Sequence, residues 1–199
     1  IYFVIVLIIF FLFFSFNQNF LNYFLSISSS MSNIGFTLDN SNTNLTFIYL
    51  ILVIIGGSFF STSSGLRFMK IYSLFIYSVN QILSFSRPKN IYKNKLFFSE
   101  VNFDFEEISK YFLSVLIFIL SLFILTTLLT ISEFSFENSF KLSILTLMNT
   151  VNSSSYGLSD LTFYNLSYFT KYCLIFFMIV GRIELLTILL LVKKFLFKN

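Results

Sequence analysis

Long apolar runs alternate with shorter ones along this chain, and the long runs predict helices that cross a membrane. The clearest run, residues 111–132, carries no charge and is long enough to cross the ~30 Å hydrocarbon core of a bilayer as a helix. A second run, residues 172–192, is interrupted by two charged residues, one of which is Arg182. A third begins near residue 45 and is broken about halfway across the membrane at Gly56-Gly57.

Two further apolar stretches, residues 20–31 and 140–148, are too short to cross and fit segments that enter the membrane and return. Each is followed by a polar turn that carries a glycine, residues 32–39 and 154–160. Both turns have a serine, a glycine three positions later, and then an apolar, a hydroxyl and an acidic residue in the same order. We therefore predict an all-α membrane protein built from two repeats of span, pore helix, filter loop and span.

This pattern divides the chain into a first repeat (1–85), a linker (86–105) and a second repeat (106–199). The opening run, residues 1–14, is too short to span, starts without Met and has no basic region or cleavage site of a signal peptide. We interpret it as the tail of a longer helix. The expectation is that this chain is a fragment or a separately encoded half of a larger protein.

Composition supports a membrane location. The chain is 56% hydrophobic and only 11% charged, whereas soluble domains carry roughly 25% charged residues. It has no His and a single Cys, so His-based metal sites, haem ligation by His pairs, Ser-His catalysis and an internal disulfide are excluded. We expect no catalytic residues, no covalently bound cofactor and no nucleic-acid partner, with membrane lipid as the surrounding medium.

Basic residues predict the orientation, because they are enriched in cytoplasmic loops. They concentrate between the two repeats and at the end of the chain, whereas the glycine turns and their flanks carry mainly Asp and Glu. We therefore expect linker 86–105 and the C-terminus in the cytoplasm, with both turns open to the outer face. The basic residues concerned are Arg67, Lys70, Arg87, Lys89, Lys93, Lys95, Lys193, Lys194 and Lys198.

The glycine turns are the candidate site. Polar backbone at membrane depth is tolerated only where it is buried in protein or lines water, and carbonyls aimed at a pore can replace the hydration shell of a cation. A short helix that ends at such a turn also directs the negative end of its dipole toward the ion. Gly35 and Gly157 are the positions where this arrangement requires glycine.

Three blocks carry a family resemblance. Residues 56–67, GGSFFSTSSGLR, resemble the glycine-rich loop that breaks the second helix of the third repeat in TrkH and KtrB proteins. Residues 181–187, GRIELLT, are similar to the signature of the fourth repeat's second helix, and residues 33–37, NIGFT, resemble a filter turn of the same family. The chain thus resembles the C-terminal half of a TrkH/KtrB potassium uptake protein, over essentially its whole length.

The resemblance implies a pseudo-symmetric channel of four repeats, in which this chain supplies the third-type repeat with the broken helix and the fourth-type repeat. It implies K⁺ transport, with some relatives carrying Na⁺, in a bacterial inner membrane. It also implies three partners: repeats one and two from missing sequence or another chain, a cytoplasmic nucleotide-binding regulator of the TrkA/KtrA type, and a second pore subunit in a homodimer.

Site residues follow from the same resemblance. The filter would comprise Asn33, Ile34, Gly35 and Phe36 with Ser155, Tyr156, Gly157 and Leu158, and K⁺ would meet the carbonyls of Ile34, Gly35, Tyr156 and Gly157. The gate would comprise Gly56, Gly57, Ser61, Thr62, Ser63, Ser64 and Gly65, with Arg182 as a positive barrier below the filter.

Departures from the family pattern leave alternatives open. Phe60 and Ser64 replace small residues and glycine in the loop, and another alignment would place Ser155 rather than Gly157 at the fourth filter position. A non-conducting or Na⁺-permeable paralogue therefore remains an alternative. A second is an organelle-encoded membrane subunit, to which the composition, rich in Phe, Ile, Asn and Ser, also points.

Overall fold

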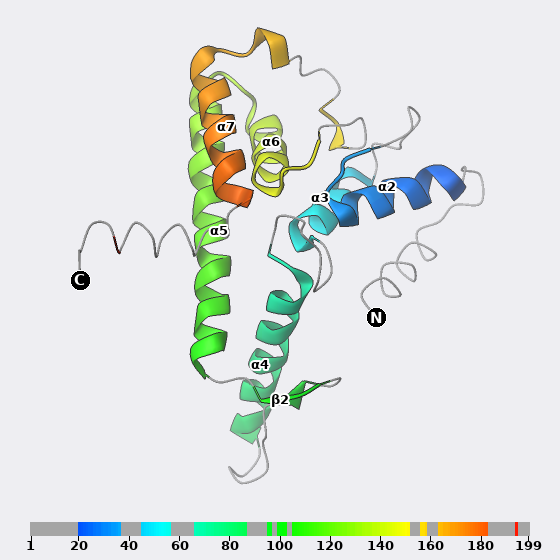
Figure 1. Cartoon of the computed structure of the whole chain (residues 1–199), viewed down its shortest axis with the longest axis vertical. Coiled ribbons are helices and arrows are strands. Elements are labelled where there is room, and N and C mark those ends of the chain that lie inside the picture. The colour runs from blue at the N-terminus through cyan, green and yellow to red at the C-terminus, as the bar shows by residue number, and fades with distance from the viewer. Residues whose placement is uncertain are drawn as a thin grey trace.

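The computed structural model contains six α-helices, one short 3₁₀-helix and one small hairpin within the part of the chain that it describes (Figure 1). These described residues are 20–36, 45–56, 66–86, 95–96, 99–102, 105–151, 156–158, 163–182 and 194. The opening run, residues 1–14, lies outside them. The elements, in order, are α2 (Phe20–Ser32), α3 (Thr46–Ile55), α4 (Phe68–Ser86), β1 (Lys95–Leu96), β2 (Ser99–Asn102), α5 (Phe105–Ile131), α6 (Phe136–Met148), η3 (Phe163–Asn165) and α7 (Tyr168–Arg182).

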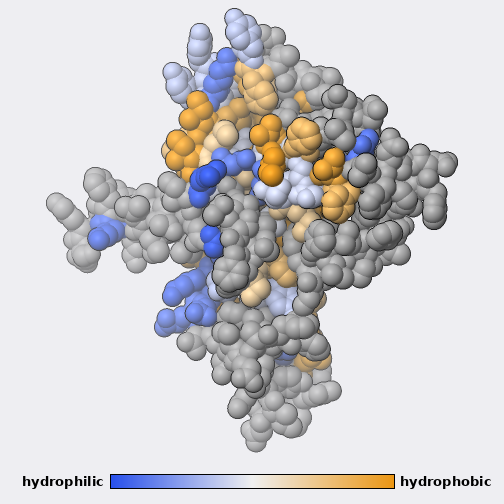
Figure 2. Space-filling view, turned by 45° about the vertical axis from the view of Figure 1, so that its right-hand side comes forward, coloured by the Kyte–Doolittle hydropathy of each residue, from blue (hydrophilic) through white to orange (hydrophobic). Residues whose placement is uncertain are grey.

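Helix α5 is the longest element, and the only described helix long and apolar enough to cross a membrane lies within it, at Glu106–Ile131. Its 27 residues extend about 40 Å at ~1.5 Å per residue. Only a third of its most apolar window is buried inside the protein, and Phe112, Leu120 and Phe123 are each more than half exposed. Figure 2 shows further hydrophobic side chains on the surface. The exposed apolar face of α5 suits contact with lipid or with additional helices.

Helix α6 lies at the centre of the helical assembly and contacts α3, α5 and α7 (Figure 1). It begins at residue 136, four residues before the predicted apolar stretch, because the Ser135 hydroxyl accepts a hydrogen bond from the Asn138 N–H and caps the helix. All of its residues from Leu142 to Met148 are buried. Its 13 residues reach only about 20 Å, which is too short to cross a bilayer.

Helix α2 has the same length as α6, 13 residues, and packs against α3. Helix α3 ends at Ile55, and Gly56 then adopts a φ of 67°, in the left-handed region that glycine enters without steric cost. The next described residues, Leu66 and Arg67, lead into α4, which packs on α5. The predicted span is therefore divided into α3 and α4, with residues 57–65 outside the described part.

The linker holds a feature that the all-α prediction missed. Strands β1 and β2 form a short antiparallel hairpin in which Lys95 pairs with Asn102 and Leu96 with Ser99. The pairing is local in sequence and needs no apolar pattern, so the hydropathy of residues 86–105 gave no signal for it.

Buried hydroxyl groups in the helices are mostly satisfied by the backbone of their own helix. Ser143 donates to the Ser139 carbonyl (2.7 Å), and Thr126 donates to that of Leu122 (2.8 Å). Such bonds satisfy the hydroxyl group within the helix. A chain rich in serine can therefore bury these residues among apolar neighbours without requiring polar partners on other helices.

Candidate functional site

The two short helices, α2 and α6, end in the same backbone conformation. Asn33 and Asn149 follow the helices directly and adopt left-handed φ values of 58° and 54°. The next residues close the turn, since the Ile34 N–H donates to the Ser29 carbonyl (3.1 Å) and the Thr150 N–H donates to that of Leu145 (2.9 Å). Asn is the commonest residue after Gly in this position because its short polar side chain tolerates the left-handed region.

The two helix ends meet. The Val151 N–H, just after α6, donates a hydrogen bond to the Ile34 carbonyl, just after α2 (3.3 Å). Gly35 is buried at this contact with a φ of 82°, and a Cβ added to it would overlap the carbonyl oxygen of Val151. The contact therefore requires glycine for two independent reasons, the backbone angle and the space.

This meeting point is suited to a cation. The C-terminal end of a helix carries a partial negative charge, and here two such ends lie side by side with short non-helical backbone between them. Ile34 and Phe36, on either side of Gly35, are each 60% exposed. The residues on either side of Gly35 thus lie at a surface of the described chain, whereas Gly35 itself is buried at the contact.

Gly157 lies in a less crowded place than Gly35. Its φ is 68°, and a Cβ placed on it would lie 3.4 Å from the Lys141 Nζ, an ordinary contact. The Lys141 ammonium also forms a salt bridge with Glu137 one turn earlier in α6. Hydrogen bonding and attraction from Lys141 lower the pKa of the exposed Glu137 carboxyl. A positive charge therefore lies beside the predicted fourth filter turn, and Glu137 compensates it.

Tyr156 and Leu158, the neighbours of Gly157, are both fully or almost fully buried. The Tyr156 hydroxyl forms a hydrogen bond with the Ser30 hydroxyl on α2 (3.2 Å). The second predicted turn is therefore anchored to α2, the short helix of the first repeat. Ser155, the alternative filter residue, lies outside the described residues.

The end of α7 packs closely on the end of α6. A Cβ added to Gly181 would overlap the Leu147 carbonyl oxygen, so this glycine, the first residue of the GRIELLT segment, allows the two backbones to approach. The Asn149 side-chain amide donates to the Met178 carbonyl (3.0 Å) and joins the same helices. Arg182 follows as the last described residue of α7, and it is exposed.

The predicted gate is described only at its borders. Gly56 is buried at the end of α3, whereas Gly57, Ser61, Thr62, Ser63, Ser64 and Gly65 lie outside the described residues. On the far side, Arg67 has a positive φ of 55°, and the Lys70 ammonium donates to the Ser114 hydroxyl of α5 (3.5 Å). Lys70, the second basic residue after the loop, is thus attached to α5.

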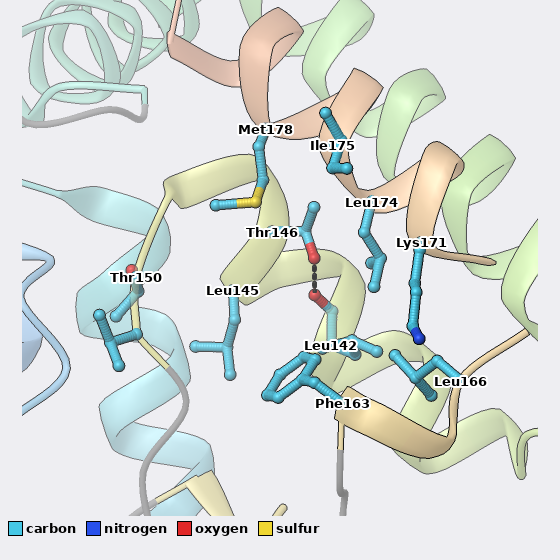
Figure 3. Close-up of a pocket in the computed structure, with 11 residues that line it drawn as sticks. Leu142, Leu145, Thr146, Thr150, Phe163, Leu166, Lys171, Leu174, Ile175 and Met178 are labelled. Atoms are coloured by element: carbon cyan, nitrogen blue, oxygen red, sulfur yellow. Dashed lines mark hydrogen bonds between the residues drawn. The ribbon is translucent and has the colours of Figure 1, made fainter. Parts of the chain in front are cut away.

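An apolar cavity of about 430 Å³ lies between α6 and α7. Figure 3 shows Leu142, Leu145 and Thr146 on α6 opposite Leu174, Ile175 and Met178 on α7. Thr150 and Val151 also line it, so it adjoins the contact with Gly35. Lys171 is held at its edge by the Tyr164 carbonyl (2.9 Å) and by the rings of Tyr164 and Tyr168.

Comparison with protein families identifies the chain. The family model of the cation transport protein TrkH matches residues 3–198. The chain belongs to the TrkH cation transport family. TrkH proteins are cation transporters rather than enzymes, and membership together with the span in α5 makes this chain a membrane protein. No match was found among curated proteins.

The structure adds site residues that the sequence did not reveal. Measured from the ends of the short helices, Asn149, Thr150 and Val151 correspond to Asn33, Ile34 and Gly35. Gly157 lies nine positions after Met148, whereas Gly35 lies three positions after the end of α2. The Asn that follows each short helix could have indicated this alignment of the two repeats. Aligning the two glycine turns instead placed Gly157, rather than Val151, opposite Gly35.

Proposed function

We propose that this TrkH-family chain supplies the third and fourth pore repeats of a potassium uptake subunit. The observation that carries the proposal is the contact between the ends of α2 and α6, where the Ile34 carbonyl meets the Val151 N–H. Two helices of equal length, with the same cap and with touching C-terminal ends, are the parts that two neighbouring repeats would contribute to one filter.

In this proposal backbone carbonyls bind the ion. Gly35, Tyr156 and Gly157 would direct their carbonyls at the pore axis, and the ring of four repeats would replace the hydration shell of K⁺. The Ile34 carbonyl already accepts a hydrogen bond from Val151, so it would offer K⁺ only its second lone pair. Selection against Na⁺ would then depend on how rigidly these turns are held.

The gate would lie beneath the filter. Residues 56–65 connect α3 to α4 along the chain, and Gly181, directly before Arg182, packs on the end of α6. A loop in the ion path and a fixed positive charge would both impede a cation. Deletion of residues 59–63 should therefore give faster K⁺ flux from inserted transporter. A stable, inserted deletion protein that conducts no faster would rule out this gate.

The remaining parts of the proposal concern the assembly. Repeats one and two would close the filter from missing sequence or another chain, and two pore subunits would pair in a bacterial inner membrane. The linker with the β1–β2 hairpin and the C-terminus would face the cytoplasm. A nucleotide-binding regulator of the TrkA/KtrA type would contact this side, because a basic segment next to the membrane is accessible only there.

The test is ion flux through the complete transporter in liposomes loaded with K⁺ or with Na⁺. Faster K⁺ than Na⁺ flux is expected, and Gly35→Ser should raise Na⁺ relative to K⁺ because the added side chain would displace the turn. Equal fluxes in the unsubstituted protein would instead identify a Na⁺-permeable paralogue. No flux from correctly inserted protein would identify a non-conducting one.

A further inference from the structure

The Tyr156 side chain connects the two repeats at the level of the filter. Its ring is completely buried, and so is Ser30, the residue on α2 that it contacts. The two residues are 126 positions apart, and their hydroxyl oxygens are 3.2 Å apart. Tyr156 directly precedes Gly157, which is exposed. The side chain therefore extends into the protein while the adjacent backbone lies at the surface.

The direction of this hydrogen bond is determined by a second one. Ser30 has a single hydroxyl proton, which it donates to the Ser26 carbonyl in the preceding turn of α2 (2.8 Å). Only its lone pairs remain for Tyr156. The Tyr156 O–H is therefore the donor and the Ser30 oxygen is the acceptor, and the pair forms a chain that runs from Tyr156 through Ser30 to the backbone of α2.

The rigid Tyr156 ring and its hydrogen bond fix the distance between the Tyr156 backbone and the Ser30 hydroxyl on α2. The length from the Tyr156 backbone to its hydroxyl cannot change, and α2 is itself anchored to the second repeat through Ile34 and Val151. The Tyr156–Ser30 hydrogen bond is thus a second tether between the repeats, and it acts on the residue whose carbonyl adjoins Gly157. Loss of the tether would leave the second turn free to move relative to the first.

We propose that Tyr156 is a specificity-determining positioning residue, whose side chain fixes the second filter turn against Ser30 and so sets the discrimination between K⁺ and a smaller cation. This inference rests on the proposed function. The side chain itself touches no ion, because its hydroxyl is buried against α2. Its effect passes through the position of its own backbone and that of Gly157.

The experiment compares Tyr156→Phe, Ser30→Ala and the double variant in the complete transporter. Tyr156→Phe removes the donor, and Ser30 keeps its bond to Ser26, so the K⁺/Na⁺ permeability ratio should fall about three-fold. Ser30→Ala leaves the buried Tyr156 hydroxyl without an acceptor, and the ratio should fall about ten-fold. In the double variant the permeability ratio should recover to the level of Tyr156→Phe, because the unpaired Tyr156 hydroxyl is no longer present.

Two controls separate positioning from general damage. Tyr164→Phe matches Tyr156→Phe at a tyrosine that is 91% exposed. Ser28→Ala matches Ser30→Ala at an exposed position of α2. Neither should change the permeability ratio. Permeability ratios within two-fold of the unsubstituted protein in both Tyr156→Phe and Ser30→Ala would overturn the inference, as would an equal effect of Tyr164→Phe.

A second measurement distinguishes a failure of the inference from a failure of the proposed function. If the unsubstituted transporter conducts no cation, the proposed function fails, and the hydrogen bond is then judged from thermal unfolding of the same four proteins. Non-additive shifts in the unfolding midpoint, with the double variant more stable than Ser30→Ala, would support the tether. Additive shifts would overturn it.

Discussion

Alanine at Gly35 should destabilise the transporter much more than alanine at Gly157, although both glycines have φ in the left-handed region, 82° and 68°. The two substitutions add the same methyl group and impose the same kind of backbone strain. They differ in what the new Cβ meets. At Gly35 it overlaps the backbone of Val151, whereas at Gly157 its nearest neighbour is the flexible end of Lys141 at 3.4 Å.

The magnitudes follow from these surroundings. A left-handed backbone costs an ordinary residue about 1–2 kcal/mol, and this is the whole expected effect of Gly157→Ala. Gly35→Ala adds the cost of forcing backbone apart in a packed site, about 1–3 kcal/mol. It also strains the bond between the Ile34 carbonyl and the Val151 N–H, which contributes about 0.5–1.5 kcal/mol. The expected total for Gly35→Ala is about 2.5–6.5 kcal/mol.

The assay is thermal or denaturant unfolding of the purified complete transporter, with the unsubstituted protein and both variants measured side by side. The difference between the two variants isolates the crowding at Val151, because the backbone term is common to both. Equal destabilisation would refute the contact between the two helix ends. It would also remove the main support for a shared filter.

Three further predictions concern the helix ends and the charges near them. Gly181→Ala should destabilise by about 1–3 kcal/mol in the same unfolding assay, because its Cβ would overlap the backbone of α6; an unchanged midpoint would contradict the packing. Arg182→Gln should raise maximal K⁺ flux ten-fold or more, since a charge ~6 Å from the ion path repels it by roughly 2–3 kcal/mol at an effective dielectric near 20; lower flux from fully inserted protein would show a structural role. Glu137→Gln should lower K⁺ flux because the Lys141 charge beside Gly157 loses its partner. In the unsubstituted protein the same loss should occur as the pH falls through the lowered pKa of Glu137, and the Gln variant should lack this pH dependence.

The helices themselves were largely predictable because their hydropathy is strong. Residues 111–132 were expected to span, and α5 begins six residues earlier, at Phe105, and ends at Ile131. Glu106 and Glu107 lie in the first turn of α5, where acidic residues are favoured. The apolar stretch 140–148 did not reveal the start of α6, which is set by the cap at Ser135.

The site was harder to predict because it depends on contacts between distant segments. The sequence indicated Gly35 correctly as a residue with a positive φ. It could not indicate that Val151 would pack against it, since a valine after a helix has no special pattern. The role of Tyr156 was hidden in the same way, because its partner Ser30 is one of several serines in succession. Whether Gly157 or Ser155 faces an ion stays a prediction.

The tether between Tyr156 and Ser30 has a consequence for biosynthesis. The ribosome must add 126 residues after Ser30 before Tyr156 exists, which takes about 6–25 s at ~5–20 residues per second. During that interval α2 is already made, but the backbone groups and the serine oxygen that will meet the second repeat have no partners. The first half of this chain must therefore remain without these contacts until synthesis of the second half supplies their partners.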